Sequence, residues 1–386
     1  MPRKIFPNKI ISPLQAIVND SRSVGIILCL CTVFSMTFSN WGATREGWLG
    51  FWETTFHLPE ELHLPHGLLH VVNDAFMAVF FFLVGMEIKR ELFLGELRDL
   101  RKALLPVFAA IGGMLIPALI YSMINKGTEF RGGWGIPMAT DIAFSLGVAS
   151  LLGSRVPASL KIFLTALAII DDLGAIITIA FFYGGKLQQI WALGALAIMV
   201  ILWFLGKTKL KFGFWHFLLG LGLWYCIFNS GIHATVAGVI FAFFVPTRAL
   251  HTWELRFHTP VNFLILPIFA LANTAIRIDG GLIPSLDNTL NAGIIAGLVI
   301  GKPLGILLFC YLLVRLGWGR LPEKVQWSQM AGVGMLAGIG FTMSIFISML
   351  AFQDPSTQNI AKIGVLAASV LSVITGCITL MIFRED

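Results

Sequence analysis

Charged residues are scarce in this chain. Asp, Glu, Lys and Arg together make up only 12% of its 386 residues, about half of the roughly 25% found in soluble domains. Hydrophobic residues make up 57%, and the mean hydropathy is +0.83. The apolar runs leave little room for a soluble domain, so the composition predicts a polytopic membrane protein.

Cysteines are also few and show no grouping that would bind a metal. We interpret them as small packing residues within apolar runs; they are Cys29, Cys31, Cys226, Cys310 and Cys377. The start of the chain lacks a signal-peptide cleavage pattern. Residues 1–23 are therefore expected to form a basic cytoplasmic lead.

Twelve apolar segments have roughly the length of a membrane-spanning helix. They are 24–39, 68–88, 103–124, 134–152, 159–182, 190–206, 213–228, 231–245, 261–276, 290–313, 328–351 and 360–383. An even number of spans places both termini on one side. Most Lys and Arg residues lie in the loops on that side, so the positive-inside rule predicts cytoplasmic termini. These basic loops on one side of the membrane also account for the pI near 9.1, so no nucleic-acid partner is predicted.

The longest loop on the outer side covers residues 40–66. Its TTFHLPEELHL stretch alternates polar and apolar residues around Pro59, which is consistent with a short periplasmic hairpin. A disordered loop is the alternative.

Small residues interrupt two spans in corresponding positions. One interruption covers 135–140 and the other covers 336–343, and each lies in the second span of a three-span group, 103–182 or 290–383. The two groups begin on opposite sides of the membrane, so they form inverted repeats, in which broken helices surround an ion site near the midplane. We therefore predict a single transmembrane transporter domain over 24–383. The alternative is that the glycines only permit close helix packing.

Three acidic residues lie inside the fourth and fifth apolar spans: Asp141 in the interrupted fourth span, and the adjacent Asp171 and Asp172 in the fifth. An Asp at mid-helix costs about 2.5–3.5 kcal/mol on insertion, so these side chains are expected to face a path for a cation or proton. Oxygens of Asp171, Asp172 and Thr140, with carbonyls of the interrupted helix, suit a hard metal cation such as Na⁺ or Li⁺. The alternative is a pair of protonated, hydrogen-bonded structural acids.

Three further polar residues interrupt apolar sequence. Lys302, in LVIGKPLGILL, needs a counter-ion, and the acids at 171–172 are the candidates for charge compensation, with Asp171 as the predicted partner. Snorkelling to the interface is the alternative. Asp74 is either an access residue or a helix-start acid. His233, in NSGIHATVAG, is either a helix-end histidine or a pH sensor.

A charged group is predicted at the cytoplasmic mouth. Glu87, Arg90 and Glu91 share one helix face by their spacing. Glu254 and His258, four residues apart in the connection before the ninth span, could join them, and His titrates near neutral pH. The group is predicted to sense pH at a cation entrance, and an ordinary interfacial ion-pair face is the alternative.

Several motifs together resemble the NhaA-type sodium/proton antiporter family. They are ATDIAFSLG, LAIIDDLGAI, VVNDAFMAVFF with LVGMEIKREL, SGIHATVAG, GKPLGI and AGIGFTMSIF, and they occur over about residues 20–384. The resemblance implies crossed, interrupted helices 4 and 11, and inverted repeats are a known feature of this family. It also implies a bacterial inner membrane and an outer hairpin that pairs two protomers in a homodimer.

The resemblance further assigns roles to residues. It implies Asp171 and Asp172 as the ion and proton carboxylates, with Asp141 and Lys302 compensating the dipoles of the broken helices. It implies activation at alkaline pH through the predicted mouth group, that is Glu87, Arg90, Glu91 and Glu254.

The sequence thus predicts an all-α polytopic membrane protein that exchanges Na⁺ or Li⁺ for H⁺ by alternating access, with no resident cofactor and no enzymatic activity. An intramembrane aspartyl protease is the enzyme alternative; it would need two acids on separate helices, such as Asp141 and Asp172. A sodium-coupled carrier of an organic solute is the third alternative.

Overall fold

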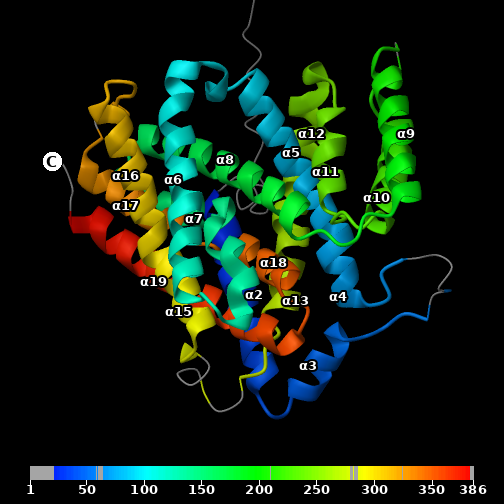
Figure 1. Cartoon of the computed structure of the whole chain (residues 1–386), viewed down its shortest axis with the longest axis horizontal. Helices are drawn as coiled ribbons and strands as arrows, with labels where there is room; N and C mark the ends of the chain where they lie inside the picture. The colour runs from blue at the N-terminus through cyan, green and yellow to red at the C-terminus, as the bar shows by residue number, and fades with distance from the viewer. Residues whose placement is uncertain are drawn as a thin grey trace, which may run out of the picture.

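The computed structural model describes residues 21–57, 59, 64–208, 210–278, 281, 286–323 and 325–382. This part of the chain is built of helices (Figure 1). Its only β-structure is one isolated bridge, between Thr55 and Gly67. The all-α class is confirmed, while most of the predicted lead 1–23 lies outside the described residues.

The helices follow the predicted spans. In chain order they are α2 (Ser21–Asn40), α3 (Arg45–Trp52), α4 (Leu68–His70), η2 (Val71–Phe76), α5 (Met77–Phe93), η3 (Glu96–Arg98), α6 (Leu100–Ile124), η4 (Glu129–Met138), α7 (Ile142–Leu151), η5 (Gly153–Arg155), α8 (Ala158–Phe182), α9 (Gln189–Gly206), α10 (Phe214–Asn229), α11 (Val236–Phe243), α12 (Thr247–Pro260), η6 (Val261–Ile265), α13 (Leu266–Asn273), α15 (Thr289–Ile295), η7 (Ala296–Gly301), α16 (Lys302–Arg315), α17 (Trp327–Ala337), α18 (Phe341–Ala351) and α19 (Pro355–Ile382).

Each of the twelve predicted spans contains a helix. Within the described ranges, eight helices are long and apolar enough to cross a membrane, or ten when each of two bent pairs is one span. The other two spans hold α10, with 16 residues, and α11, with 8. α11 is shorter than predicted because a turn at Gly231, with φ of +86°, precedes it. Its rise of about 12 Å is less than half of a bilayer core.

Two spans are broken in the middle, as predicted. η4 and α7 are bent by 46° at residues 139–141, and α17 and α18 are bent by 46° at residues 338–340. Pro137 near the first break removes a backbone donor, and the glycines of the second weaken a continuous helix. The backbone N–H of Asp141 donates to the carbonyl of Ile339 at 2.7 Å, so the two breaks are hydrogen-bonded to each other.

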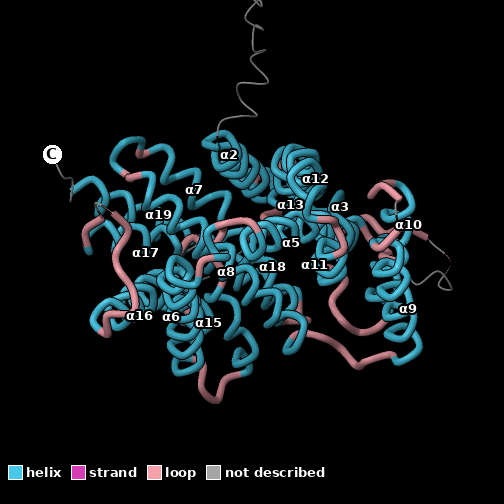
Figure 2. The backbone as a smooth tube through the Cα atoms, turned by 90° about the horizontal axis from the view of Figure 1, so that it is seen from above, coloured by secondary structure: helices cyan, strands magenta, loops and turns pink. Residues whose placement is uncertain are grey.

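The broken spans cross where they meet. η4 packs against α18, and α7 packs against α17. α6 packs along α16, and α8 runs obliquely across the bundle beside α6 (Figure 1). α9 and α10 form a pair at one side of the molecule (Figures 1 and 2). This is the predicted arrangement of crossed, interrupted helices 4 and 11 in inverted repeats. The end of the bundle at which α6 and α8 begin is called the inner end below.

The outer loop contains a helix that the sequence did not predict. α3 packs on α2, and the indole of Trp48 donates to the Ser35 hydroxyl at 3.1 Å. After α3 the two arms of the loop are joined, since the backbone N–H of Phe56 donates to the carbonyl of His66 at 2.7 Å. Residues 58 and 60–63 lie outside the described ranges, so the hairpin itself stays a prediction.

A close contact and a buried lysine fix α11 to α5. A side-chain carbon at Gly238 would collide with the carbonyl oxygen of Ala78, so only glycine fits there. At the inner end, Lys89 is 8% exposed, and its Nζ donates to the carbonyls of Phe243 at 2.6 Å and Val245 at 2.5 Å. These carbonyls end α11, where the helix dipole favours a cation. The sequence indicated Lys89 only as a flanking positive charge.

Replacing Lys89 by Met is expected to destabilise the protein. The substitution keeps an unbranched chain but removes the donor from two carbonyls, that of Val245 in a buried hydrogen bond and that of Phe243 in a partly buried one. The loss costs about 1–3 kcal/mol in the free energy of unfolding. Thermal unfolding of the purified protein measures the loss, with the exposed Lys186→Met as control. Equal midpoints for the two variants would contradict the role of Lys89 in holding α11.

Candidate cation and proton site

Five predicted site residues meet where the broken spans cross. Thr140 and Asp141 lie in the break between η4 and α7, Asp171 and Asp172 lie in the middle of α8, and Lys302 begins α16. Each of the five is at most 2% exposed. Four charged side chains are thus gathered inside an apolar bundle, where charges persist only when they are partnered or functional.

Asp141 caps the starts of two half-helices. Its Oδ1 accepts from the backbone N–H of Phe144 at 2.9 Å, in the first turn of α7. Its Oδ2 accepts from the backbone N–H and the hydroxyl of Thr342, at 3.0 and 2.5 Å, at the start of α18. Because both helix starts carry partial positive charge, a carboxylate here is favourable. The geometry is the one that the predicted dipole compensation requires.

Lys302 forms an ion pair with Asp171, as predicted, and its side chain does not reach solvent. Its Nζ donates to Oδ2 of Asp171 and to the carbonyl of Met138, the last residue of η4. The side chain is fully buried, so snorkelling is excluded. The Thr140 hydroxyl lies 2.6 Å from the same Asp171 oxygen and 2.8 Å from the carbonyl of Ala337, at the end of α17. Lys302 and Thr140 thus meet the carboxyl ends of η4 and α17, which are the negative ends of these half-helices.

The two neighbouring acids have different surroundings. Asp172 lines a cavity of about 210 Å³, whereas Asp171 does not. Oδ1 of each residue is buried and has no hydrogen-bond partner among the described residues. Unpartnered buried carboxylate oxygens are costly, so they suit a site that takes up a cation or proton.

Among the described residues no group of three or more His, Cys, Asp or Glu side chains could hold a metal ion. A hard cation at Asp171 and Asp172 would therefore need hydroxyl or carbonyl oxygens to complete its ligands. The Thr140 hydroxyl, 2.6 Å from Oδ2 of Asp171, is one such group, and the carbonyls at the two breaks are further candidates. These ligand assignments stay predictions.

The cavity at Asp172 leads to the predicted mouth group. Glu87, Arg90 and His258 line it together with Asp172 and Asp141. Glu254 and His258 lie on α12, so the predicted connection is in fact the first part of a continuous helix. α5 and α12 pack together and bring the group to the inner end of the bundle.

Arg90 is the centre of the mouth group. Its guanidinium contacts Oε1 of Glu254 at 2.5 Å and Oε1 of Glu91 at 3.0 Å. Oε2 of Glu254 is buried without a hydrogen-bond partner among the described residues. His258 is exposed, and its Nε2 lies 3.0 Å from the amide nitrogen of Asn262. The structure thus brings the predicted mouth residues together around one cation.

Asp74 and His233 form a separate pair. Asp74 lies in the π-helical turn η2, and its Oδ1 is 4.0 Å from Nε2 of His233. Nδ1 of His233 is 3.1 Å from the Thr235 hydroxyl, just before α11. Asp74 precedes α5, whereas the mouth residues of that helix lie near its far end, so the pair with His233 lies apart from the mouth group.

Sequence reasoning gave no role to two residues that make important hydrogen bonds. Thr342, which lies inside the predicted interruption 336–343, gives Asp141 two hydrogen bonds. Lys89 stands beside Arg90, and its buried state had no signal in a run of charged residues.

Comparison with known proteins identifies the family. The family model described as Na⁺/H⁺ antiporter 1 matches residues 15–380. The chain is 44% identical to the Na⁺/H⁺ antiporter NhaA of Cytophaga hutchinsonii over 98% of this chain and 97% of that protein. It is 48% identical to the Na⁺/H⁺ antiporter NhaA of Escherichia coli over 94% of this chain and 96% of that protein.

A solved structure has the same fold. The sodium proton antiporter MjNhaP1 from Methanocaldococcus jannaschii matches with a TM-score of 0.50 and 15% sequence identity, over 95% of this chain and 100% of that one. Together with the matching family model and the NhaA relatives, the crossed broken helices and the buried carboxylates lead to one conclusion. The chain belongs to the Na⁺/H⁺ antiporter 1 family.

Proposed function

We propose that this protein is a Na⁺/H⁺ antiporter that also accepts Li⁺. The observation that carries the proposal is the pair of adjacent buried acids, of which Asp172 opens to a cavity while Asp171 is held by Lys302. Family membership and the names of the relatives support the same exchange. Oxygens that bind a hard cation are also oxygens that bind protons, so one site can serve both ions.

Competition couples the two ions. A Na⁺ that reaches Asp172 through the cavity meets its unpartnered Oδ1 and that of Asp171. Coordination draws Asp171 away from Lys302, and the positive charge of the ammonium then becomes unfavourable next to the cation. Protons leave as Na⁺ enters, because the same carboxylates cannot hold both. Loss of more than one proton for each Na⁺ makes the exchange electrogenic, and a membrane potential then drives it by about 2.3 kcal/mol per charge per 100 mV.

The broken helices provide the movement. Asp141, Thr140 and Lys302 join the ends of four half-helices with hydrogen bonds, so these ends can move together as one unit. Tilting this unit against the surrounding helices exposes the acids to one side of the membrane at a time. In the described structure the cavity at Asp172 leads to the inner end. In our proposal, this conformation is the one that takes up an ion from the cytoplasm.

Orientation and regulation complete the proposal. Both termini are cytoplasmic in a bacterial inner membrane, by the distribution of basic residues. The mouth group around Arg90 senses pH and activates exchange at alkaline pH, since Glu254 and His258 change charge with pH. A homodimer formed through the 40–66 loop stays part of the proposal.

Two other functions fit the site less well. An aspartyl protease needs two acids that face one water, but both carboxylate oxygens of Asp141 are occupied by donors from helix starts. A carrier of organic solutes needs room for its solute, and the cavity of about 210 Å³ at Asp172 is smaller than the roughly 300–1,000 Å³ of small-molecule sites.

Asp172→Asn is expected to abolish exchange. Asn keeps the size of Asp and one carbonyl oxygen but cannot exchange a proton. Na⁺- and Li⁺-dependent dequenching of a pH dye in membrane vesicles should disappear, and calorimetric Na⁺ binding should be lost while the protein stays folded. The exposed Asp287→Asn is the control. Na⁺-driven exchange retained by Asp172→Asn would refute the assignment.

Lys302→Ala is expected to lower both stability and activity. Removing the ammonium leaves Asp171 buried and unpaired, which costs about 3–5 kcal/mol in the free energy of unfolding. Thermal unfolding and vesicle transport measure the two effects, with the exposed Lys186→Ala as control. A Lys302→Ala protein with normal stability and full exchange would rule out the role of the pair.

Glu254→Gln is expected to shift the dependence of transport on pH and to keep the maximal rate. The substitution leaves the charge of Arg90 less neutralised, so the cavity at Asp172 becomes less negative and holds protons less strongly. The activity curve should move to lower pH by roughly half a unit, the size expected for an ion pair in which one partner, Arg90, is partly exposed. Vesicle transport over a pH series measures the shift, and Glu129→Gln at the outer end is the control. An unmoved curve, or loss of exchange at every pH, would contradict pH sensing by this group.

A further inference from the structure

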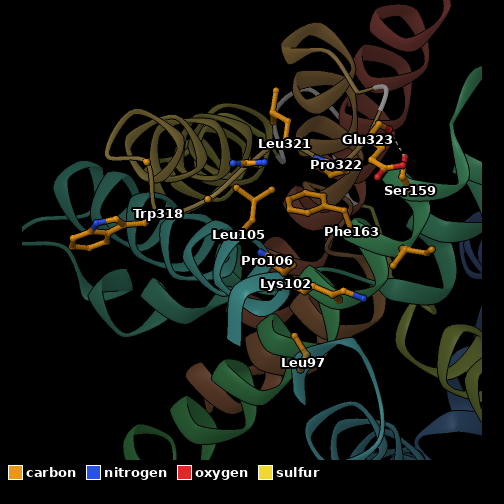
Figure 3. Close-up of a pocket in the computed structure, with 15 residues that line it drawn as sticks. Leu97, Lys102, Leu105, Pro106, Ser159, Phe163, Trp318, Leu321, Pro322 and Glu323 are labelled. Atoms are coloured by element: carbon orange, nitrogen blue, oxygen red, sulfur yellow. Dashed lines mark hydrogen bonds between the residues drawn. The ribbon is translucent and has the colours of Figure 1, made fainter. Parts of the chain in front are cut away.

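A second, larger cavity lies at the inner end of the bundle. Its volume is about 870 Å³, within the roughly 300–1,000 Å³ of sites for small molecules. Its walls are the first turns of α6 and α8 and residues 317–323 between α16 and α17 (Figure 3). It shares no lining residue with the cavity at Asp172. The proposed ion path therefore does not account for it.

The inner wall of this cavity is apolar. Leu105 and Phe163 are 5% and 3% exposed, and Figure 3 shows them in the middle of the lining. Ile162 and Trp318, which also line it, are 56% and 64% exposed. Figure 3 shows Trp318 at the edge, away from Phe163. An apolar wall that continues into exposed apolar side chains at the end of membrane-spanning helices suits the upper part of a lipid chain.

The cavity also carries a positive electrostatic balance. Lys102 and Arg320 contribute two cations to the lining, and Glu323 contributes its one acid. α6 and α8, each of 25 residues, begin here, so their positive ends add to the field. The N-cap position of α8 is Pro157, which has no side-chain acceptor for the first amides of the helix. The balance favours an anion.

Aromatic residues place this cavity at the level of lipid headgroups. The rings of Tyr311 and Trp327 are 5.7 Å apart, and the guanidinium of Arg315 lies 6.0 Å over the Tyr311 ring. Such aromatic and basic belts lie at the membrane–water interface. The apolar span of α6 begins at Lys102, and that of α16 ends at Arg315. A ligand in this cavity would be half in the headgroup region and half in the hydrocarbon.

We propose that this cavity binds the phosphate headgroup of an anionic phospholipid from the adjoining leaflet. Basic pockets between membrane helices are known to bind such headgroups. Lys102 and Arg320 contact the phosphate, and Leu105, Ile162 and Phe163 contact the glycerol and the first carbons of an acyl chain. On the orientation proposed above the leaflet is cytoplasmic, but the binding itself does not depend on ion exchange.

The bound lipid joins three elements. Lys102 belongs to α6 and Arg320 to the connection between α16 and α17, while the Ser159 hydroxyl of α8 already donates to the carbonyl of Glu323 at 3.1 Å (Figure 3). A phosphate held by both cations therefore links the start of α6 to the segment that positions the inner end of α8. The lipid should stabilise the fold around the helix that carries Asp171 and Asp172.

Lipid binding to the full chain tests this proposal. The protein is purified in detergent and titrated with dioleoyl phosphatidylglycerol or dioleoyl phosphatidylcholine, with bound lipid counted by native mass spectrometry and unfolding followed by temperature. Phosphatidylglycerol should bind in preference and raise the melting temperature by several degrees. Equal binding of the two lipids would overturn the proposal. If inorganic phosphate alone raised the melting temperature as much as phosphatidylglycerol does, the ligand would be free phosphate and the proposal of a lipid would be wrong.

Variants place the site. Lys102→Ala with Arg320→Ala should weaken phosphatidylglycerol binding about 25-fold, since each cation near a membrane surface is worth about fivefold. Glu323→Gln removes the negative charge from the cavity lining and should strengthen phosphatidylglycerol binding about fivefold. Arg155→Ala with Arg248→Ala, exposed and outside the cavity lining, is the matched control. Wild-type affinity in both the double variant and Glu323→Gln would exclude this cavity, whatever the result of the transport assays.

Discussion

The ammonium of Lys302 and the carboxylate of Asp171 lie fully buried in the bundle, and each depends on the other. Neither could stay charged alone in this setting, because an isolated charge in a low-dielectric interior costs several kcal/mol. The pair also takes in the carbonyl of Met138 and the hydroxyl of Thr140. It thereby fixes α8 and α16 against the break in the fourth span. The crossing of the broken helices is built around this contact.

The Lys302–Asp171 pair also gives the two neighbouring acids, Asp171 and Asp172, different surroundings. Side chains of adjacent helical residues point about 100° apart, so with Asp171 turned to Lys302, Asp172 is free to face the cavity. In the proposed mechanism, a cation that reaches Asp172 competes with Lys302 for Asp171, which would link cation binding to proton release. Asp141 completes the site from the other side by holding the starts of α7 and α18 together. Binding and helix movement then involve the same atoms.

Much of this could be predicted from the sequence because buried charge is so rare. The pairing of Lys302 with the acids of α8, and the breaks in two spans, followed from the cost of charge and from runs of small residues. The pairing of Lys302 with Asp171, which leaves Asp172 for the cation, was also predicted, but the cavity that Asp172 lines could not be, since it depends on how α8 packs against its neighbours. The short α11 and the buried Lys89 depend on the turn at Gly231 and on the carbonyls at the end of α11, which accept hydrogen bonds from Lys89. Helix α3 was missed because its eight residues are too few to show a helical hydrophobic period.

The central claim is that protons and Na⁺ compete for the same carboxylate oxygens. Calorimetric titration of Na⁺ into the purified wild-type protein, over a series from alkaline to acidic pH, tests it most directly. In the range where the site takes up protons, the affinity for Na⁺ should fall by about tenfold per pH unit for each proton that is displaced. An affinity for Na⁺ that stays the same at every pH, in a protein that stays folded, would contradict the account.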